Sequence, residues 1–392
     1  MGAPVPARAL VAAALTTLLL LVSVAATIAQ PEVRFDPPSA RGAFGQNVTF
    51  STTFSAGTLP ARVELLTRGP DDDADRVTLA TVEPAGDGWR ATVSLAGHIA
   101  PNTSWRYRFR AVTPDGEVLG PVGQHRLVDE RYEWALLEGE RVRVWAYEGG
   151  EDFARRALET AEAAVDAAAT LLGVDDTAPV DFFIYTDERE FRQAMGPATR
   201  ENIGGQAHLG TRTLFGLIKP SQIGSDWVDE VITHELAHLV FHDVVDNPYQ
   251  YPPRWLNEGV AVYLAEGYAE GRRAQVEGAA SGGTIIPLEG LGGQFPTRAG
   301  RQSLAYAVSI DAVDHFVETY GEPALVELLA AFGEGRGLDG AFLAATGQDF
   351  AAFDSGWLAS LGADQPEPYG PTEVEPGPVP EAWTERTSAL LR

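Results

Sequence analysis

Two histidines four residues apart, inside the apolar run Val231–Val240, constrain this chain more than any other feature. In an α-helix, positions four apart differ by about 40° around the axis, so the imidazoles of His234 and His238 leave the same face one turn apart and can bind one metal ion. Glu235 is turned about 100° from His234, which brings its carboxylate beside such an ion without making it a ligand. The stretch therefore predicts a helix that carries a metal site.

A catalytic zinc ion takes three protein ligands and leaves the fourth position to water, so a third donor is needed. The chain contains no cysteine, which restricts the donors to histidine and carboxylate side chains. Our candidate is Glu258, which follows Pro252 and Pro253 in a segment whose apolar spacing continues for about three helical turns. It lies 20 residues after His238, enough for one helix to end and a second to return to the metal.

A different arrangement of three ligands does not fit the chain. The pattern H-E-x-x-H-x-x-G-x-x-H requires Gly and His where the sequence has Phe241 and Val244. His242 lies one further turn along the same helical face, and a straight helix does not bring it to the same ion. Glu258 therefore stays the predicted third ligand.

With these residues in place, the sequence resembles the gluzincin zinc metallopeptidases, which are thermolysin-like, and within them the peptidase MA-like bacterial proteins. The resemblance rests on His234–His238, on Trp255–Gly259 and on Ser303–Ser309, and it covers roughly residues 130 to 361. It implies that His234, His238 and Glu258 bind Zn²⁺. It also implies that Glu235 is the general base that activates a water molecule to hydrolyse peptide bonds.

The same resemblance implies two further roles. In gluzincins a Tyr or His from the helical part downstream donates a hydrogen bond to the oxyanion, and Tyr306 is our candidate, with His315 as the alternative. An edge strand lies along the cleft and pairs with an extended substrate, a role that we carry over to Gly205–Leu209. His208, within that segment, is more typical of a surface or loop histidine than of a catalytic group.

Two positions depart from the family pattern. Many gluzincins have an Asp four residues after the third ligand that orients a zinc histidine, and here Val262 occupies that place. Asp229 or a backbone carbonyl are the alternatives for this role. The Gly-x-Met-x-Asn segment that anchors the substrate amine in related aminopeptidases is also missing, which favours an endopeptidase.

The fold class predicted for the chain is multidomain: an N-terminal all-β sandwich, then an α+β gluzincin metallopeptidase domain with an α-helical C-terminal lobe. Residues 31–128 contain short alternating apolar runs between turns, and about seven such strands are typical of an immunoglobulin or fibronectin type III-like module, here interpreted as a spacer. Asn47 and Asn102 in it match the N-glycosylation pattern. The metallopeptidase domain spans 129–361, and a disordered tail rich in Pro and Glu spans 362–392.

Residues 1–30 contain Arg8 as their only charged side chain, followed by an apolar run from Ala9 to Ala29. This pattern predicts a signal peptide or an uncleaved membrane anchor, and hence an extracellular or cell-surface protein. The net charge of −26 argues against nucleic acid as a partner, so the expected partner is a peptide or protein substrate. The sequence leaves the oligomeric state open.

The competing interpretation is an extracellular binding or adhesion protein whose zinc site is structural or degenerate. A closed zinc site needs a fourth protein ligand, which His242 or His208 would have to provide. The position of these two histidines relative to His234, His238 and Glu258 therefore distinguishes the two interpretations.

Overall fold

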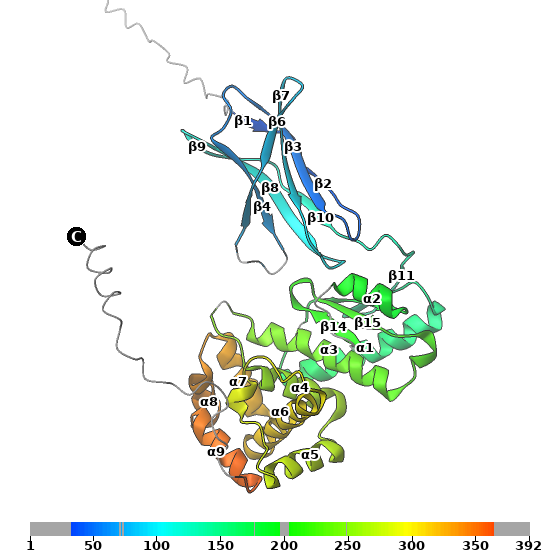
Figure 1. Ribbon diagram of the computed structural model, residues 1–392, viewed down its shortest axis with the longest axis vertical. Helices are drawn as coiled ribbons and strands as arrows, with labels where there is room; N and C mark the ends of the chain where they lie inside the picture. The colour runs from blue at the N-terminus through cyan, green and yellow to red at the C-terminus, as the bar shows by residue number, and fades with distance from the viewer. Residues whose placement is uncertain are drawn as a thin grey trace, which may run out of the picture.

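The computed structural model describes residues 33–363, apart from 70, 71, 73, 176, 197–203 and 248. Figure 1 shows a β-sheet region, drawn in blue to cyan, followed by a part rich in helices, drawn in green to red. The predicted N-terminal β-sandwich followed by a helical domain is confirmed. The predicted signal or anchor at 1–30 lies outside the described residues, as does nearly all of the predicted tail. No helix in the described ranges is long and apolar enough to cross a membrane.

The sandwich consists of two five-stranded antiparallel sheets. The first contains β1 (Val33–Phe35), β2 (Ser39–Arg41), β3 (Val48–Ala56), β6 (Thr81–Ala85) and β7 (Gly88–Leu95). The second contains β4 (Arg62–Arg68), β5 (Arg76–Leu79), β8 (Ser104–Thr113), β9 (Gly116–Leu119) and β10 (Gly123–Arg126). Alternate side chains of β3 and β8 are buried between the sheets, as the period-2 pattern predicts. The described residues contain more strands than the seven expected, because β1, β2, β9 and β10 are too short to show an apolar alternation.

A third sheet supports the helical domain, with the strand order β11-β12-β13-β15-β14. Its strands are β11 (Ala135–Glu138), β12 (Val142–Ala146), β13 (Val180–Tyr185), β14 (Gly205–His208) and β15 (Thr213–Leu217). The central strands β12, β13 and β15 are parallel, while β11 and β14 pair antiparallel with their neighbours at the two edges. Strands β14 and β15 therefore form a hairpin, and β14 is an edge strand, as the family resemblance implied for Gly205–Leu209.

Nine α-helices are found among the described residues. They are α1 (Gly150–Leu172), α2 (Glu188–Met195), α3 (Asp226–Val245), α4 (Arg254–Glu266), α5 (Glu270–Ser281), α6 (Ala299–Tyr320), α7 (Glu322–Gly333), α8 (Leu338–Thr346) and α9 (Phe350–Ser360). Gly173 ends α1 in the left-handed conformation, at φ 70°, as its position in the sequence predicts. Gly259 brings α4 against α6, since a Cβ at this position would lie 2.4 Å from the carbonyl oxygen of Ser309.

The sandwich is joined to the helical domain by buried polar contacts. Asn102 is 5% exposed, and its amide nitrogen donates to Asp181 Oδ2 at 3.0 Å and to Thr213 Oγ1 at 2.7 Å. Arg126 also contacts both Asn102 and Asp181. The Asn102 amide is committed to these buried bonds, which disfavours glycosylation there although the sequence matches the pattern.

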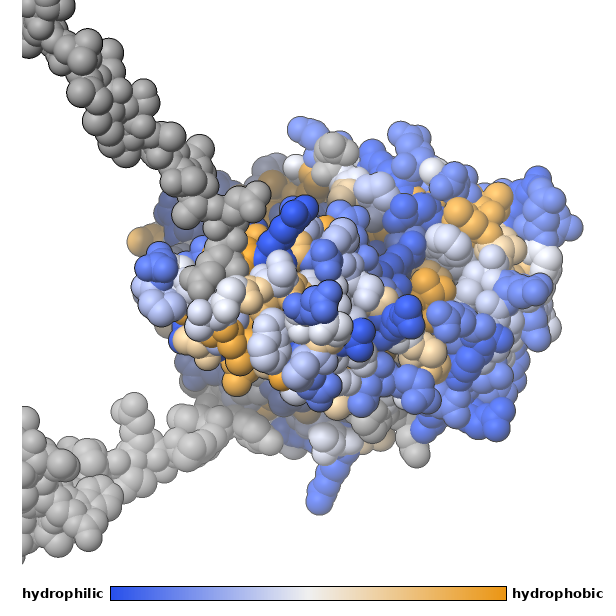
Figure 2. Space-filling view, turned by 90° about the horizontal axis from the view of Figure 1, so that it is seen from above, coloured by the Kyte–Doolittle hydropathy of each residue, from blue (hydrophilic) through white to orange (hydrophobic). Residues whose placement is uncertain are grey.

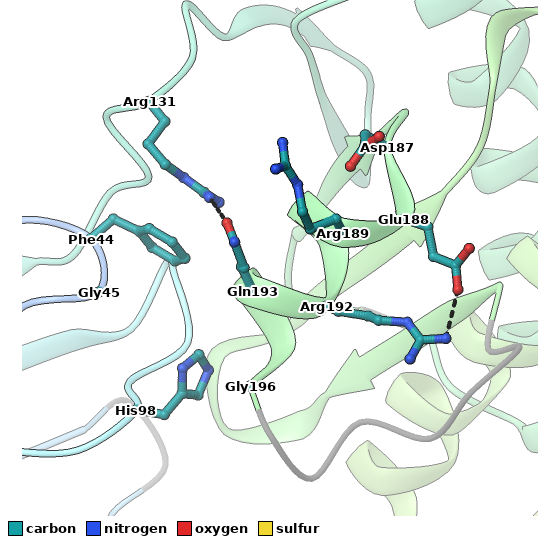
Figure 3. A pocket seen from close by; sticks show the side chains of 10 residues that line it. All are labelled: Phe44, Gly45, His98, Arg131, Asp187, Glu188, Arg189, Arg192, Gln193 and Gly196. Atoms are coloured by element: carbon teal, nitrogen blue, oxygen red, sulfur yellow. Dashed lines mark hydrogen bonds and ion pairs between the residues drawn. The ribbon is translucent and has the colours of Figure 1, made fainter.

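A cavity of about 1010 Å³ lies where the sandwich meets α2 (Figure 3). Arg131 donates to Gln193 at 2.6 Å there and lies over the ring of Phe44, 4.0 Å from its centroid. None of the predicted metal ligands lines this cavity. The chemistry predicted from the sequence therefore belongs to a different part of the molecule.

Candidate active site

The three predicted metal ligands converge, although they come from two helices. His234 and His238 lie one turn apart on α3, and their Nε2 atoms are 3.2 Å from each other. Glu258, on α4, presents Oε2 at 3.5 Å from His234 Nε2 and 3.6 Å from His238 Nε2. All three donor atoms lie within 4.8 Å of one another, and no other His, Cys, Asp or Glu of the described residues belongs to the group.

The spacing of these atoms fits a zinc ion. Ligands about 2.0–2.1 Å from a tetrahedral metal lie about 3.4 Å from each other, close to the three separations observed. Two imidazoles and one carboxylate are also donor types that zinc accepts, and three protein ligands leave one tetrahedral position open. The set therefore has the composition and spacing of a catalytic zinc site.

Nearby charged groups keep the Glu258 carboxylate ionised, as a metal ligand has to be. Burial of Glu258 raises its pKa, but contact with His234 and the charges of His238 and Arg254 outweigh burial and lower the pKa to about 2. Burial likewise lowers the pKa of His234, but its contact with Glu258 and the nearby charge of Glu235 outweigh this, and the net direction is upward. Glu258 is therefore ionised at neutral pH, and the upward shift at His234 increases the competition between a proton and a metal ion there.

A residue that the sequence interpretation missed orients one of the predicted ligands. Asn257 Oδ1 lies 2.8 Å from Nδ1 of His238. A proton on Nδ1 donates to this amide oxygen, which leaves the lone pair of Nε2 to face Glu258 and the metal position. Asp229, one of the alternatives for a partner of a zinc histidine, instead binds Arg156 and Thr160 of α1. Asn257 could have been suspected from its place next to Glu258, but only the packing of α3 on α4 shows which histidine it meets.

We expect Asn257→Ala to weaken zinc binding roughly 10- to 100-fold, the usual effect of removing a group that orients a metal ligand. The measurement is competition for zinc against a chromophoric chelator. Asn257→Asp is the matched control, because its carboxylate still accepts from His238 Nδ1, and it should stay near the wild-type affinity. Equal zinc affinities for the Ala variant and the wild type would contradict the role of Asn257 in orienting His238.

Glu235 lies beside the ligands without belonging to the group, as predicted. Its Oε2 accepts a hydrogen bond of 2.9 Å from the backbone N–H of Ala207 on β14. Gly205 of the same strand packs so closely that a Cβ there would lie 2.9 Å from Glu235 Cγ. The edge strand thus fixes the position of the candidate base from one side.

These groups line an open cavity of about 640 Å³ between β14, α3, α4 and α6. Tyr306 of α6 is part of its wall, and its ring centroid is 6.4 Å from that of His234. The remaining lining is mostly small or uncharged, and includes Gln206, Gly292, Gly293, Gln294 and Gln302. The cavity therefore offers room for a substrate directly at the metal ligands.

The other candidate histidines do not join this site. His242 lies 3.8 Å from Asp246, and His315 packs against Phe353. His208, expected to be a surface or loop histidine, is the last residue of β14 and is partly buried: it packs edge-on against Phe215, with a ring centroid distance of 5.0 Å. Neither His242 nor His208 lines the cavity, so neither supplies the fourth ligand that a closed zinc site requires.

The burial of His208 predicts a dependence of stability on pH. Burial, and to a lesser extent the charge of His98, lowers its pKa from 6.5 to about 4. Between these values the unfolded chain binds the proton and the folded chain does not, so stability falls as the pH is lowered from 6.5 to 4, by at most about 3 kcal/mol. His208→Gln should lose less stability over this range in urea unfolding with a chelator present. The same pH dependence in both proteins would contradict the assignment.

The overall arrangement has weak likenesses among solved structures. An aminopeptidase N family protein from Idiomarina loihiensis is 10% identical, with a TM-score of 0.41, over 77% of this chain and 70% of that chain. An M1 zinc metallopeptidase from Deinococcus radiodurans is 13% identical, with a TM-score of 0.37, over 88% of this chain and 97% of that chain. No curated protein matches the chain.

A family model gives a firmer result. The model described as the peptidase MA superfamily matches residues 160–363, which are 204 of the 392 residues. The matched range contains His234, Glu235, His238, Glu258 and the whole wall of the cavity around them. With this match and the convergent ligand set, the chain belongs to the peptidase MA superfamily and is a zinc metallopeptidase.

Proposed function

We propose that this metallopeptidase is a zinc-dependent endopeptidase of the gluzincin type. The observation that carries the proposal is the convergence of His234, His238 and Glu258 on one point at the wall of an open cavity, with the Glu235 carboxylate beside them. Bound zinc supplies a Lewis acid and lowers the pKa of water at its open position to about 7.

The residues of the chain supply the proton transfers. Glu235 has one oxygen held by the Ala207 N–H, and its carboxylate accepts the proton of the attacking water molecule. The same carboxyl group then donates this proton to the amine nitrogen of the leaving group, so the base is regenerated when the peptide bond is broken. The fixed position of Glu235 keeps the donor and the acceptor within reach of each other.

Tyr306 is proposed as the donor that stabilises the oxyanion of the tetrahedral intermediate, since it stands in the wall of the cavity close to His234. Tyr306→Phe should lower kcat roughly 100- to 1000-fold with little change in KM, because the hydrogen bond forms only as the charge develops. Steady-state kinetics on a quenched fluorescent peptide measures this. A kcat within a few-fold of the wild type would remove Tyr306 from the mechanism.

The edge strand β14 is proposed to bind the substrate main chain. It is the last strand of its sheet, and Gly205, Gln206 and Ala207 line the cavity. An extended peptide can add to such an edge by main-chain hydrogen bonds, which fixes its direction while tolerating many side chains. Because the strand binds the main chain of an extended peptide, this mode of binding supports cleavage at an internal peptide bond and requires no particular side chain.

The charges in the cavity also support an endopeptidase over an aminopeptidase. An enzyme that removes N-terminal residues needs an acidic group for the substrate amine. Among the described residues, the acidic ones that line this cavity are Glu235 and Glu258, and each already has an oxygen bound by the protein. The cationic Arg254 in the same wall would repel an amine. An internal peptide segment has no free amine, so it needs no acidic group and is not repelled by Arg254.

The experiment compares a pair of peptides of identical sequence, one with a free and one with an acetylated N-terminus, together with unfolded casein. We expect chelator-sensitive cleavage of casein, and cleavage of both peptides at the same internal bond. Cleavage of the free peptide alone, one residue at a time, would make the protein an aminopeptidase. If protein with one bound zinc cleaves neither peptide nor casein, the zinc is structural.

Export is proposed from residues 1–30, whose apolar run follows a single arginine. The face of the molecule in Figure 2 is mostly hydrophilic, as the net charge of −26 leads us to expect. Fusing residues 1–35 to a reporter that is active only after export tests this. A reporter retained in the cytoplasm would contradict the proposal.

A further inference from the structure

We propose that Arg254 is a positioning residue that keeps Glu258 a one-oxygen ligand of the metal. The inference rests on the proposed function, because it concerns the same metal site. Arg254 Nε and Nη2 both donate to Oε1 of Glu258, at 3.0 and 2.8 Å. The opposite oxygen, Oε2, is the one that faces the Nε2 atoms of His234 and His238. The guanidinium thus occupies one oxygen and leaves the other for the metal.

The way in which Arg254 binds this carboxylate leaves one of its oxygens free of the guanidinium. An arginine and a carboxylate commonly form two parallel hydrogen bonds, one to each oxygen. Here both donors go to a single oxygen of Glu258, whose side chain is 9% exposed. Two bonds on Oε1 restrain the carboxylate from rotating that oxygen toward the histidines.

Local sequence rules do not explain the position of this arginine. Arg254 is the first residue of α4, where the partial positive charge of the helix end disfavours a cation. Its partner Glu258 follows four residues later, which is the weaker order for an ion pair on a helix. Arg254 departs from both helix preferences, the one for charge at the helix end and the one for the order of an ion pair. We therefore attribute its position to a role at the metal site.

Contacts outside α4 hold the guanidinium in place. The Arg254 backbone N–H donates to the carbonyl oxygen of Gly292 at 2.9 Å, which ties the start of α4 to the loop after the short helix Leu288–Leu291. The guanidinium carbon lies 4.9 Å from the ring centroid of Phe295 in the same loop. The loop therefore holds the guanidinium of Arg254 in the position from which it binds Glu258.

The physical consequence concerns the open coordination position. A carboxylate can bind a cation through one oxygen or through both. Binding through both oxygens of Glu258 would add a fourth protein donor atom and use the position that a catalytic site leaves to water. An arginine committed to Oε1 prevents this arrangement. Arg254 thereby determines whether the site formed by His234, His238 and Glu258 keeps one coordination position for water.

The test uses the full chain, freed of metal by a chelator and loaded with one equivalent of Co²⁺. The visible absorption of Co²⁺ depends on the type, number and arrangement of its donors, so it reports the replacement of water by a second carboxylate oxygen. We expect Arg254→Lys and Arg254→Gln to change the absorption spectrum relative to the wild type. We also expect zinc affinity, measured by chelator competition, to change roughly 10- to 100-fold.

Arg272→Gln is the matched control. Arg272 also binds a carboxylate with two donors, Glu266 at 2.7 and 2.5 Å, and its exposure is similar to that of Arg254, but it does not line the cavity. Its spectrum and zinc affinity should match the wild type. Thermal unfolding of the metal-free proteins identifies a variant that does not fold. If Arg254→Gln fails, Arg254→Lys decides, because lysine keeps the charge but is a point donor without the planar fork.

The outcomes separate this inference from the proposed function. A wild-type protein that binds no Co²⁺ or Zn²⁺ at neutral pH would overturn the metal site itself. A wild type that binds one equivalent, with both folded Arg254 variants unchanged in spectrum and affinity, would overturn only the role of Arg254. A changed spectrum in the Arg254 variants, and not in the Arg272 variant, supports it.

Discussion

Glu235→Gln should abolish nearly all turnover, by roughly 10³-fold or more, while the protein keeps its zinc. The amide is the same size as the carboxylate and its oxygen still accepts the Ala207 N–H, so the fold and the ligands stay in place. The amide cannot accept the proton of water, however, and the transfer to the leaving amine is lost with it. Peptide hydrolysis and metal content, measured on the same preparation, check both halves of the expectation.

The two measurements together make this a specific test. Loss of activity with loss of zinc would show that Glu235 is needed for binding, which its place outside the ligand group argues against. Full activity with zinc bound would remove Glu235 as the base. Glu230→Gln, on the same helix and outside the cavity, is the control and should retain wild-type turnover.

His234→Ala should lose zinc and, with it, activity. If a binding free energy on the order of 10 kcal/mol is shared among three ligands, removing one costs about 3 kcal/mol, or at least a hundredfold in Kd. Metal analysis after gel filtration gives the stoichiometry, and chelator competition gives the Kd. The fold should survive, because the His234 side chain is partly exposed and belongs to no buried apolar contact of α3.

His242→Ala is the matched control for this variant. His242 lies on α3 one turn beyond His238, yet it is outside the ligand group and contacts Asp246. Its substitution should leave zinc at one equivalent per chain. Loss of zinc in the His242 variant, or full zinc in the His234 variant, would contradict the assignment of ligands.

The sequence was most informative where the physics is local. The helical period places His234 and His238 on one face of α3, and the proline pair before Trp255 marks the start of α4. The buried strand Val180–Tyr185 and the end of α1 at Gly173 follow from equally short patterns. These features depend on neighbours within a few residues, so no knowledge of the packing was needed.

The prediction of Glu258 as the third ligand went beyond local patterns. It rested on the chemistry of zinc, which needs a third donor, and on the distance along the chain to the next helix. Convergence within 3.6 Å depends on how α4 packs against α3 and α6, with Gly259 allowing the close approach. The sequence could name the residue but not the geometry.

Two residues have contacts with distant segments that a short pattern could not predict. His208, expected to be a surface or loop histidine, is partly buried at the end of β14, and the charge of the sandwich residue His98 affects its pKa. Asn102 matches a glycosylation pattern, but its amide is buried against Asp181 and Thr213. In each case the partner lies far away in the sequence, and a pattern of a few residues contains no information about it.

The sequence by itself determined the chemical identity of the site, because ligand type, helical spacing and the absence of cysteine are properties of the chain alone. Only the tertiary structure decided which groups orient the side chains of the site: Asn257 on His238, Ala207 on Glu235 and Arg254 on Glu258. The physical reason is that hydrogen bonds of about 3 Å require separate elements to pack within that distance, and the packing is fixed by the core of the whole domain.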